Sequence, residues 1–316
     1  MPEFYLGIDG GQSSTTALIA DSSGRILGSG KGGPCNHVAA SEGRAKFRSA
    51  VGNCVRQACE EAGLDSSAVT FASACFGFSG GPEDKAAYVR ELIRSKRYKI
   101  THDAEIALSG ATAGEPGIII IAGTGSMAFG RNGRGEAARA GGWGYVFGDE
   151  GGAFDLVRRA LRASLQYEEG WGAQTVLRSH LLNATGAPSA NAVLHDFYTA
   201  EYPRTRVAAL APLVSEAANS GDEVADRILQ SAAGELVRYT EGVYRNVFRD
   251  DERPPVAYIG GVFRSGRLRS YYRKLIEQRI SCAVIAPKLQ PAAGAVLDAL
   301  RMAGNDSELS GVTEAK

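Results

Sequence analysis

The chain has 316 residues, and its 35 basic and 35 acidic side chains cancel, so the net charge is zero with neutral histidines. A balanced charge gives no electrostatic footprint for nucleic acid or for an anionic membrane surface. A composition of 44% hydrophobic and 22% charged residues is ordinary for a soluble globular enzyme. No apolar run approaches about 18 residues, and the chain starts directly in a strand pattern, so we expect neither a membrane span nor a signal peptide.

The cysteines indicate a reducing compartment. There are five of them, at positions 35, 54, 59, 75 and 282, and no two have CxxC spacing. An odd number without metal-ligand spacing predicts reduced thiols in the cytoplasm, and disfavours a disulfide framework or a zinc site.

The first third of the chain has the pattern of a sheet with interleaved helices. Its sequence predicts strands over 4–9, 15–20 and from 25, a helix over 42–62, a strand over 69–78, a helix over 83–95, a short strand over 99–101 and a helix over 104–113. Polar residues follow two of these strands, at Ser79 and at His102-Asp103. Side chains in that position lie at the carboxyl edge of a sheet, where α/β proteins bind ligands.

The rest of the chain begins by repeating this plan. A strand over 117–122, a small-residue hairpin over 123–126 and a strand over 127–131 copy the start of the chain, which indicates an internal duplication. The pattern then predicts helices over 153–166, 174–182, 190–199, 206–218 and 223–248, a strand over 256–259, a helix over 268–278, a strand over 282–286 and a helix over 292–301. We therefore expect an α/β fold with one domain over 1–115 and a second over 116–316.

The two hairpins are candidate phosphate clamps. The first contains Gly10, Gly11, Gln12 and Ser13, and the second is Gly123-Thr124-Gly125-Ser126. Glycine allows close approach of a phosphate to backbone N–H groups, and the hydroxyls add donors. Either hairpin alone could simply be a tight turn, but two of them favour a polyphosphate held from both sides.

Three other motifs are weighed against this interpretation. The P-loop pattern GxxxxGK[ST] is absent. A GxGxxG match at Gly28, Gly30 and Gly33 is followed by Pro34 and lacks the helix of a dinucleotide site. The segment Gly77 to Gly81 fits the GxSxG nucleophile elbow of a serine hydrolase using Ser79, although no suitably placed histidine follows.

Acidic residues supply the candidate chemistry. Asp103 is positioned to act as a general base in phosphoryl transfer, or merely to cap the helix that follows. Asp9 could hold Mg²⁺ through water, or simply form the turn. Asp149 and Glu150 lie near Trp143 among glycines, a combination that suits a sugar, although acidic residues also favour a helix N-terminus.

These segments together resemble the N-acetylglucosamine kinases of the BadF/BadG/BcrA/BcrD ATPase group, within the actin-like, sugar-kinase and Hsp70 superfamily. The matching stretches are GIDGGQSSTTALIAD at 7–21, Asn36, FGFSGG at 76–81, THDA at 101–104, IAGTGS at 121–126, GGWGYVFGDEGGAF at 141–154 and IGGVFRSG at 259–266. The resemblance implies two actin-like (ribonuclease H-like) domains with nucleotide and sugar in the cleft between them. It also implies ATP- and Mg²⁺-dependent phosphorylation of the 6-hydroxyl of an amino sugar, most simply N-acetylglucosamine.

The resemblance also assigns roles to individual residues. It makes Asp103 the base on the sugar hydroxyl, and Asp9 stays the candidate magnesium residue. ATP would be bound by Gly10, Gly11, Gln12, Ser13, Gly123, Thr124, Gly125, Ala208, Gly260, Gly261 and Arg264. The sugar would be bound by Asn36, Asp103, Gly142, Trp143, Gly144 and Asp149. No substrate-specific residue could be assigned within 165–205.

Several alternatives remain at this point. Glucosamine, N-acetylmannosamine or N-acetylmuramic acid could replace N-acetylglucosamine, because these sugars differ only in substituents that sequence does not read. An iron–sulfur activator of a dehydratase shares the fold but needs paired cysteines. A sugar-responsive regulator without catalysis and the Ser79 hydrolase are further classes. We expect small-molecule partners only, with no nucleic acid or membrane, and a homodimer is an open expectation because helices over 153–248 offer surface for one.

Overall fold

The computed structural model describes residues 2–11, 14–35 and 41–311 of the chain. These residues divide into two compact units, one formed by residues 1–117 and 286–316 and the other by residues 118–285. In the described residues no helix is long and apolar enough to cross a membrane.

The first unit is built on a five-stranded sheet in the order β3-β2-β1-β4-β5. Its strands are β1 (Phe4–Gly10), β2 (Thr15–Asp21), β3 (Ile26–Gly32), β4 (Ser73–Phe78) and β5 (Tyr98–His102). The first three strands pair antiparallel, and β4 and β5 add in parallel to β1. Three parallel strands therefore end at the same edge of this sheet.

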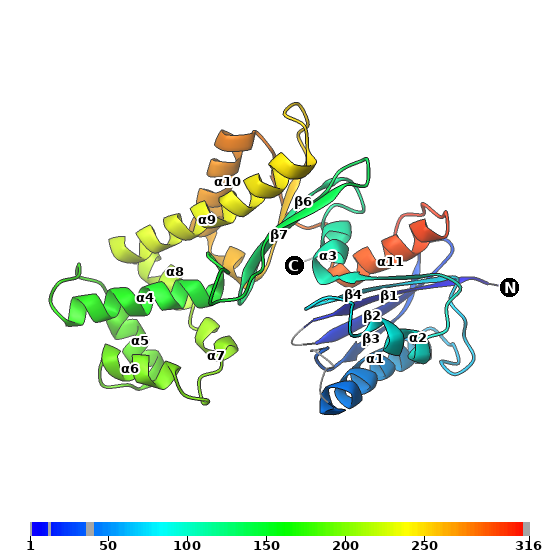
Figure 1. The fold of residues 1–316 in the computed structure, drawn as a ribbon, viewed down its shortest axis with the longest axis horizontal. Coiled ribbons are helices and arrows are strands. Elements are labelled where there is room, and N and C mark those ends of the chain that lie inside the picture. Colours follow the sequence, from blue (N-terminus) through cyan, green and yellow to red (C-terminus); the bar gives the residue numbers. More distant parts are fainter. Residues whose placement is uncertain (1, 12–13, 36–40, 312–316) are drawn as a thin grey trace. The chain divides into compact units, whose positions relative to one another are not determined.

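Helices cover both faces of the first sheet (Figure 1). On one face lie α1 (Ser41–Glu61) and the short α2 (Ala86–Leu92), and on the other lie α3 (Asp103–Ala111) and α11 (Pro291–Met302). Gly28 and Gly30 allow α1 to pack directly on β3, because a Cβ at either position would overlap a helix carbonyl. This close packing explains the GxGxxG match, which is not a dinucleotide motif.

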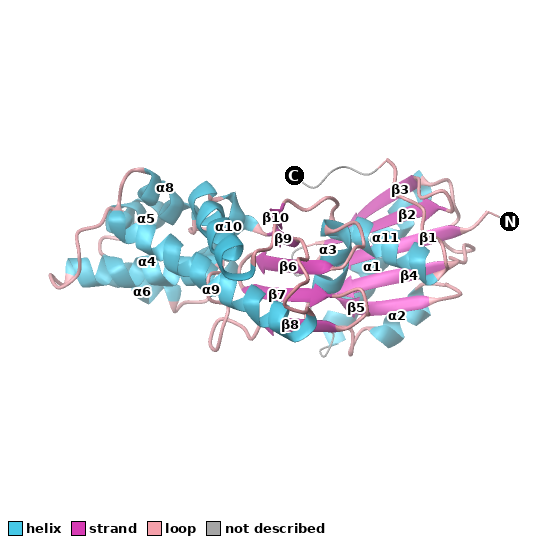
Figure 2. Ribbon diagram, turned by 90° about the horizontal axis from the view of Figure 1, so that it is seen from above, coloured by secondary structure: helices cyan, strands magenta, loops and turns pink. Residues whose placement is uncertain are grey.

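The second unit repeats the same strand order. Its sheet runs β10-β9-β6-β7-β8, formed by β6 (Gly117–Ala122), β7 (Ser126–Arg131), β8 (Ala137–Gly141), β9 (Val256–Ile259) and β10 (Val284–Ile285). A meander of three strands is again extended by two parallel strands. The α/β fold and the internal duplication are confirmed, and Figure 2 shows the two sets of strands.

Helices make up most of the remaining second unit. They are α4 (Ala153–Glu168), α5 (Leu177–Thr185), α6 (Ala190–Phe197), α7 (Arg204–Ala208), α8 (Pro212–Asn219), α9 (Glu223–Val247), the 3₁₀ turn η1 (Gly261–Arg264) and α10 (Gly266–Ile280). One continuous hydrophobic core joins these helices to the buried isoleucines of β6. Ile118 and Ile120 belong to this core, Ile119 is also fully buried and Ile121 is partly buried, so most of the four-isoleucine run is buried as expected of such a strand.

Two sequence expectations need correction. The predicted helix over 206–218 is two helices, because the chain turns before Pro212, whose ring cannot continue a helix. The expected second domain, 116–316, included the C-terminal segment, whereas α11 packs on α3, β1 and β4 of the first unit. Small residues permit this packing, since Gly7 and Gly294 lie directly against the backbone of α11 and α3 respectively.

Candidate active site

The carboxyl edge of the first sheet carries three candidate residues, Asp9, Ser79 and Asp103. The parallel register places Asp9 beside Gly77, and Phe78 beside His102. The backbone N–H of Ser79 donates to the Gly10 carbonyl at 3.0 Å, which ties the first hairpin to the end of β4. Sequence positions far apart thus meet at one edge, as the strand–loop–helix pattern predicted.

Asp103 is the first residue of α3. The N-cap position belongs to His102, which makes no side-chain capping bond, so Asp103 is not simply the helix cap. Its carboxylate accepts the Ala104 N–H at 2.9 Å and a hydrogen bond from the Ser79 hydroxyl. Burial raises the pKa of Asp103 above its usual range, although these hydrogen bonds oppose the shift. A partly buried carboxylate with a raised pKa is a better general base than an exposed one.

Ser79 therefore acts as a neighbour of Asp103, close enough to lower the pKa of its carboxyl. No hydrogen bond in the described part of the chain joins Ser79 to the histidine base that a serine nucleophile would require. The structure therefore does not support a serine hydrolase that uses Ser79 as its nucleophile.

Asp9 lies on the same edge of the sheet, where the negative charge of Asp103 acts on its carboxyl group. Burial and the repulsion from Asp103 raise the pKa of Asp9 to about 7. Asp9 also lines a cavity of about 580 Å³, whose other walls include Thr16 of β2 and the start of α11 at Gln290 and Pro291. Two mutually repelling carboxylates would be relieved by a divalent cation, and Mg²⁺ keeps most of its ligands as water, so the donor set fits this ion.

The backbone of the first hairpin is tightly fixed where the structure describes it. The Gly11 N–H donates to the Ser14 carbonyl at 2.9 Å, and the Cys35 N–H donates to Gly11 at 3.0 Å. A side chain at Gly10 would overlap the Phe78 ring. Gln12, Ser13 and Asn36 lie outside the described residues.

The second hairpin is held by the start of α4. The Gly123 N–H donates to the Gly125 carbonyl at 2.9 Å, and the Ala153 N–H donates back to Gly123 at 2.8 Å. Thr124 is half-buried, and its carbonyl accepts the Phe154 N–H at 3.2 Å. This arrangement leaves Thr124 at the tip of a short, rigid turn between β6 and β7.

The glycine-rich loop before α4 packs directly against this hairpin. The Ser126 hydroxyl donates to the Glu150 carbonyl at 2.6 Å, and the Ser126 N–H reaches the Asp149 carboxylate at 3.4 Å. Gly142 donates to the Ser126 carbonyl at 3.0 Å. Within the second unit, the predicted phosphate hairpin and the predicted sugar loop are thus directly hydrogen-bonded to one another.

Asp149 and Trp143 differ sharply in exposure. Asp149 is 5% exposed and adopts a left-handed backbone with φ of 64°, which is uncommon outside glycine. Trp143 is 65% exposed and Phe147 is 79% exposed. Because α4 begins only at Ala153, Asp149 and Glu150 do not belong to its first turn, and the helix-dipole explanation does not apply to them.

Arg204 is a residue that the sequence analysis did not identify. Its guanidinium pairs with the Asp149 carboxylate and lies 5.2 Å from the ring centre of Tyr145. The pair is separated by 55 residues, so no local sequence pattern could have indicated it.

Of the predicted adenosine residues, Gly260, Gly261 and Arg264 lie together after β9, whereas Ala208 lies in α7. Gly260 follows β9 with φ of 113°, and a Cβ there would lie 2.5 Å from the Ala122 carbonyl carbon, so this position requires glycine. Gly261 and Arg264 follow in η1, where both are exposed. Ala208 is buried in α7, which packs against α4. Its adenosine role stays a prediction.

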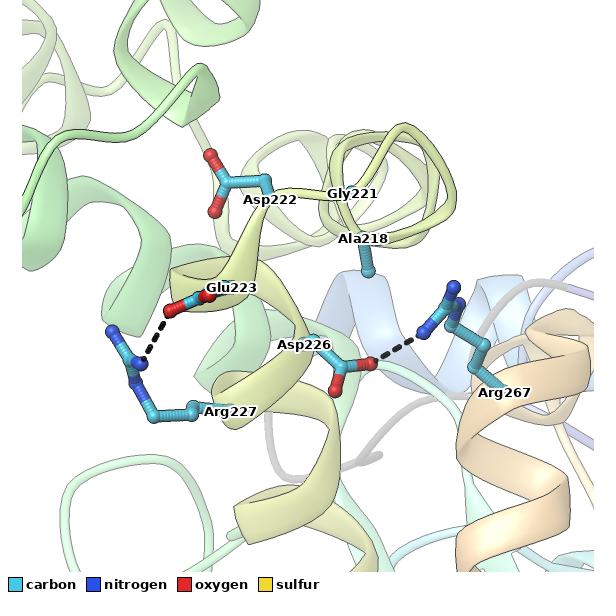
Figure 3. A pocket seen from close by; sticks show the side chains of 7 residues that line it. All are labelled: Ala218, Gly221, Asp222, Glu223, Asp226, Arg227 and Arg267. Atoms are coloured by element: carbon cyan, nitrogen blue, oxygen red, sulfur yellow. Dashed lines mark hydrogen bonds and ion pairs between the residues drawn. The ribbon is translucent and has the colours of Figure 1, made fainter.

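Another cavity, of about 320 Å³, lies at the start of α9 and contains none of the predicted site residues (Figure 3). Arg227 points toward Glu223 and Arg267 toward Asp226. Asp222 caps α9 and accepts the Val176 N–H. These charges satisfy one another, and the cavity carries no chemistry of its own.

The remaining alternatives can be judged from the same coordinates. None of the five cysteines forms a disulfide and all five are buried. Across 2–11, 14–35 and 41–311, no group of three or more histidine, cysteine or acidic residues could hold a metal ion. Burial raises the pKa of Cys54 to about 12, so this thiol is protonated and inert at neutral pH.

Comparison with known proteins decides the family. The model of the BadF/BadG/BcrA/BcrD ATPase family matches residues 6–299. The chain belongs to this family. The chain is similar to an N-acetylmuramic acid/N-acetylglucosamine kinase from Clostridium acetobutylicum, 30% identical with 93% of this chain and 97% of that protein covered. An N-acetyl-D-glucosamine kinase from Dictyostelium discoideum is 31% identical, with 94% and 98% covered.

A solved structure agrees with this membership. A Chromobacterium violaceum protein, provisionally assigned as an N-acetylglucosamine kinase, superposes with a TM-score of 0.75 at 29% identity, covering 93% of this chain and 98% of the other. The fold and the family membership therefore agree.

Proposed function

We propose that this protein transfers the γ-phosphoryl group of ATP to the 6-hydroxyl of an amino sugar, with N-acetylglucosamine as the preferred acceptor. The observation that carries the proposal is Asp103, a carboxylate with a raised pKa at the carboxyl edge of three parallel strands, held by Ser79. The kinase relatives and the ATPase family support the reaction class.

The chemistry depends on positioning and on charge. In the proposed mechanism, Asp103 orients the sugar hydroxyl and accepts its proton as the oxygen attacks the γ-phosphorus. The bond between the γ-phosphorus and the β,γ-bridging oxygen breaks, and ADP leaves with that oxygen. The hairpin around Thr124 would bind phosphate oxygens through its hydroxyl and backbone N–H groups, and Gly260 would allow the purine to approach the backbone. Asp149 would accept hydrogen bonds from sugar hydroxyls, with Trp143 as an apolar wall.

Magnesium completes the proposed site. Asp9 would hold the ion through water, and Mg²⁺ would neutralise charge on the transferring phosphates. The predicted roles of Gln12, Ser13 and Asn36 rest on the sequence alone. We also propose a cytoplasmic location, because five buried cysteines without a disulfide suit a reducing compartment.

A coupled assay of ADP release tests the proposal. N-acetylglucosamine, glucosamine, N-acetylmannosamine and N-acetylmuramic acid would be compared at equal concentration, with Mg²⁺ present or chelated. We expect N-acetylglucosamine to give the highest kcat/KM and chelation to abolish turnover. N-acetylmuramic acid is a second candidate acceptor because one relative is named for both sugars. Absence of sugar-stimulated ADP release with all four would contradict the kinase proposal.

A further inference from the structure

Arg204 contacts both halves of the second unit's site. Its Nη2 donates to Oδ2 of Asp149, and a Cβ at Gly125 would lie 2.7 Å from the same nitrogen. The guanidinium therefore lies against the phosphate hairpin as well as against the predicted sugar carboxylate. Arg204 reaches this place from the start of α7, outside every motif that carries the family resemblance.

Both oxygens of the Asp149 carboxylate have protein partners. Oδ2 accepts from Arg204, and Oδ1 faces the Ser126 N–H at 3.4 Å. A carboxylate has about four acceptor positions, so each oxygen keeps capacity for a sugar hydroxyl. The two donors, Arg204 and the Ser126 N–H, fix the orientation of the carboxylate and so the direction of its remaining lone pairs. A binding group recognises its ligand precisely only when neighbouring residues hold it in this way.

Arg204 is also held in an unusual way. Its Nε is one of two buried side-chain polar atoms without a hydrogen-bond partner in the described part of the chain. Leaving such a donor unpaired lowers the stability of the folded protein. Unsatisfied groups of this kind concentrate where position serves function more than stability. The Tyr145 ring beneath the guanidinium fixes its plane, and Tyr145 in turn packs edge-on against Phe154 of α4.

We propose that Arg204 is the positioning residue of the sugar site, holding Asp149 where it accepts hydroxyls of the acceptor sugar. The inference rests on the proposed kinase function. It assigns to Arg204 an effect on sugar recognition through Asp149, and no direct part in binding the nucleotide.

The test compares Arg204→Gln with Arg204→Lys and with the control Arg206→Gln. Arg206 lies on the same helix but stacks on Tyr202 at 4.2 Å. We expect Arg204→Gln to raise the sugar KM so that kcat/KM for the sugar falls by about 100-fold, as for a misplaced binding group. The KM for ATP should change less than about threefold. Arg204→Lys should recover part of the loss, since the charge returns without the planar fork.

A double-mutant cycle with Asp149→Asn separates positioning from mere structure. If Arg204 acts through Asp149, the double variant should lose no more sugar kcat/KM than Asp149→Asn alone. Sugar binding followed by the fluorescence of Trp143, with Trp171→Phe in the background so that Trp143 alone reports, gives a second readout that does not depend on turnover. Thermal melting of each variant shows whether the fold is intact.

The outcomes are distinct. A wild-type sugar KM in Arg204→Gln, or a loss equal to that of Arg206→Gln, would overturn the positioning role. So would a change confined to the KM for ATP, or additive losses in the double variant. A wild-type enzyme that phosphorylates none of the four sugars would instead contradict the proposed function itself.

Discussion

Asp9 and Asp103 are close enough at the carboxyl edge of the first sheet for the charge of Asp103, together with burial, to raise the pKa of Asp9 to about 7. The two carboxylates come from β1 and from the first turn of α3, more than 90 residues apart in the chain. Neither acid has a salt bridge within the described residues, and a fold that places two acids together in this way accepts a loss of stability in return for chemistry.

The pH dependence of stability should show this loss. A raised folded-state pKa means that the folded protein binds the Asp9 proton more tightly than the unfolded chain. Its stabilising effect is therefore full below about pH 4 and is lost as the pH rises through about 7. Asp9→Asn should be more stable than wild type at pH 8, by about 1–3 kcal/mol, because solvent access reduces the ~4 kcal/mol of a three-unit shift.

Urea unfolding at pH 3, pH 5 and pH 8, with EDTA present, measures this difference. Asp21→Asn is the matched control, since hydrogen bonds from Ser23 and Arg25 lower the pKa of Asp21. That variant should lose stability at pH 8 and lose little at pH 3, the opposite sign. If the free energies of unfolding of wild type and Asp9→Asn differ by the same amount at every pH, the pKa of Asp9 is not raised in the folded protein.

The catalytic role of Asp103 predicts a separation of binding from turnover. Asp103→Asn keeps the size and most hydrogen bonds of the side chain but removes the base, so kcat should fall by about 10²- to 10⁴-fold. Sugar and ATP binding, measured by calorimetry, should stay close to normal. Near-wild-type turnover in Asp103→Asn would refute the assignment.

Ser79→Ala provides the companion measurement. Its hydroxyl lowers the pKa of Asp103, so its loss should raise that pKa and move the acid limb of the kcat profile to higher pH. The enzyme should remain active, whereas a serine hydrolase would lose all activity.

Gly125→Ala should disconnect the phosphate hairpin from the sugar loop. An added Cβ would overlap the Asp149 carboxylate and approach Arg204 to 2.7 Å, so one of these groups must move. We expect kcat/KM to fall by about 100-fold. Gly234→Ala in α9 is the control, because nothing lies within 4 Å of its Cβ and alanine favours a helix by about 1 kcal/mol. Steady-state kinetics and melting of both variants check the prediction, and equal activity would contradict it.

The C-terminal helix should contribute directly to the stability of the first unit. Asp298 of α11 is 6% exposed and forms an ion pair with Lys99 of β5 at 2.9 Å. It also accepts a hydrogen bond from the Ser109 hydroxyl of α3 at 2.9 Å. Asp298→Ala leaves the Lys99 charge without one partner and should cost about 3 kcal/mol of unfolding free energy. Arg56→Ala removes an exposed pair with Glu60 and should cost less than about 0.5 kcal/mol. Chemical denaturation of the two variants measures the contrast.

The sequence by itself determined the features that depend on neighbours along the chain. Buried strands, small-residue hairpins and the strand–helix junction at Asp103 follow from local apolar periodicity and from backbone freedom at glycine, and the structure has all three. The duplication could be predicted because each copy carries its own hairpin. Pro212 shows the limit of this local reading, since an apolar pattern continued where the helix could not.

Only the tertiary structure decided what depends on contacts between distant segments. The return of α11 to the first sheet comes from close packing of small residues, which a linear pattern does not encode. The same holds for the raised pKa of Asp9, which needs a second carboxylate nearby, and for the Arg204–Asp149 pair, which joins α7 to the loop before α4. Charge and packing act across space, and their effect on a residue becomes visible only when the partner segment is in place.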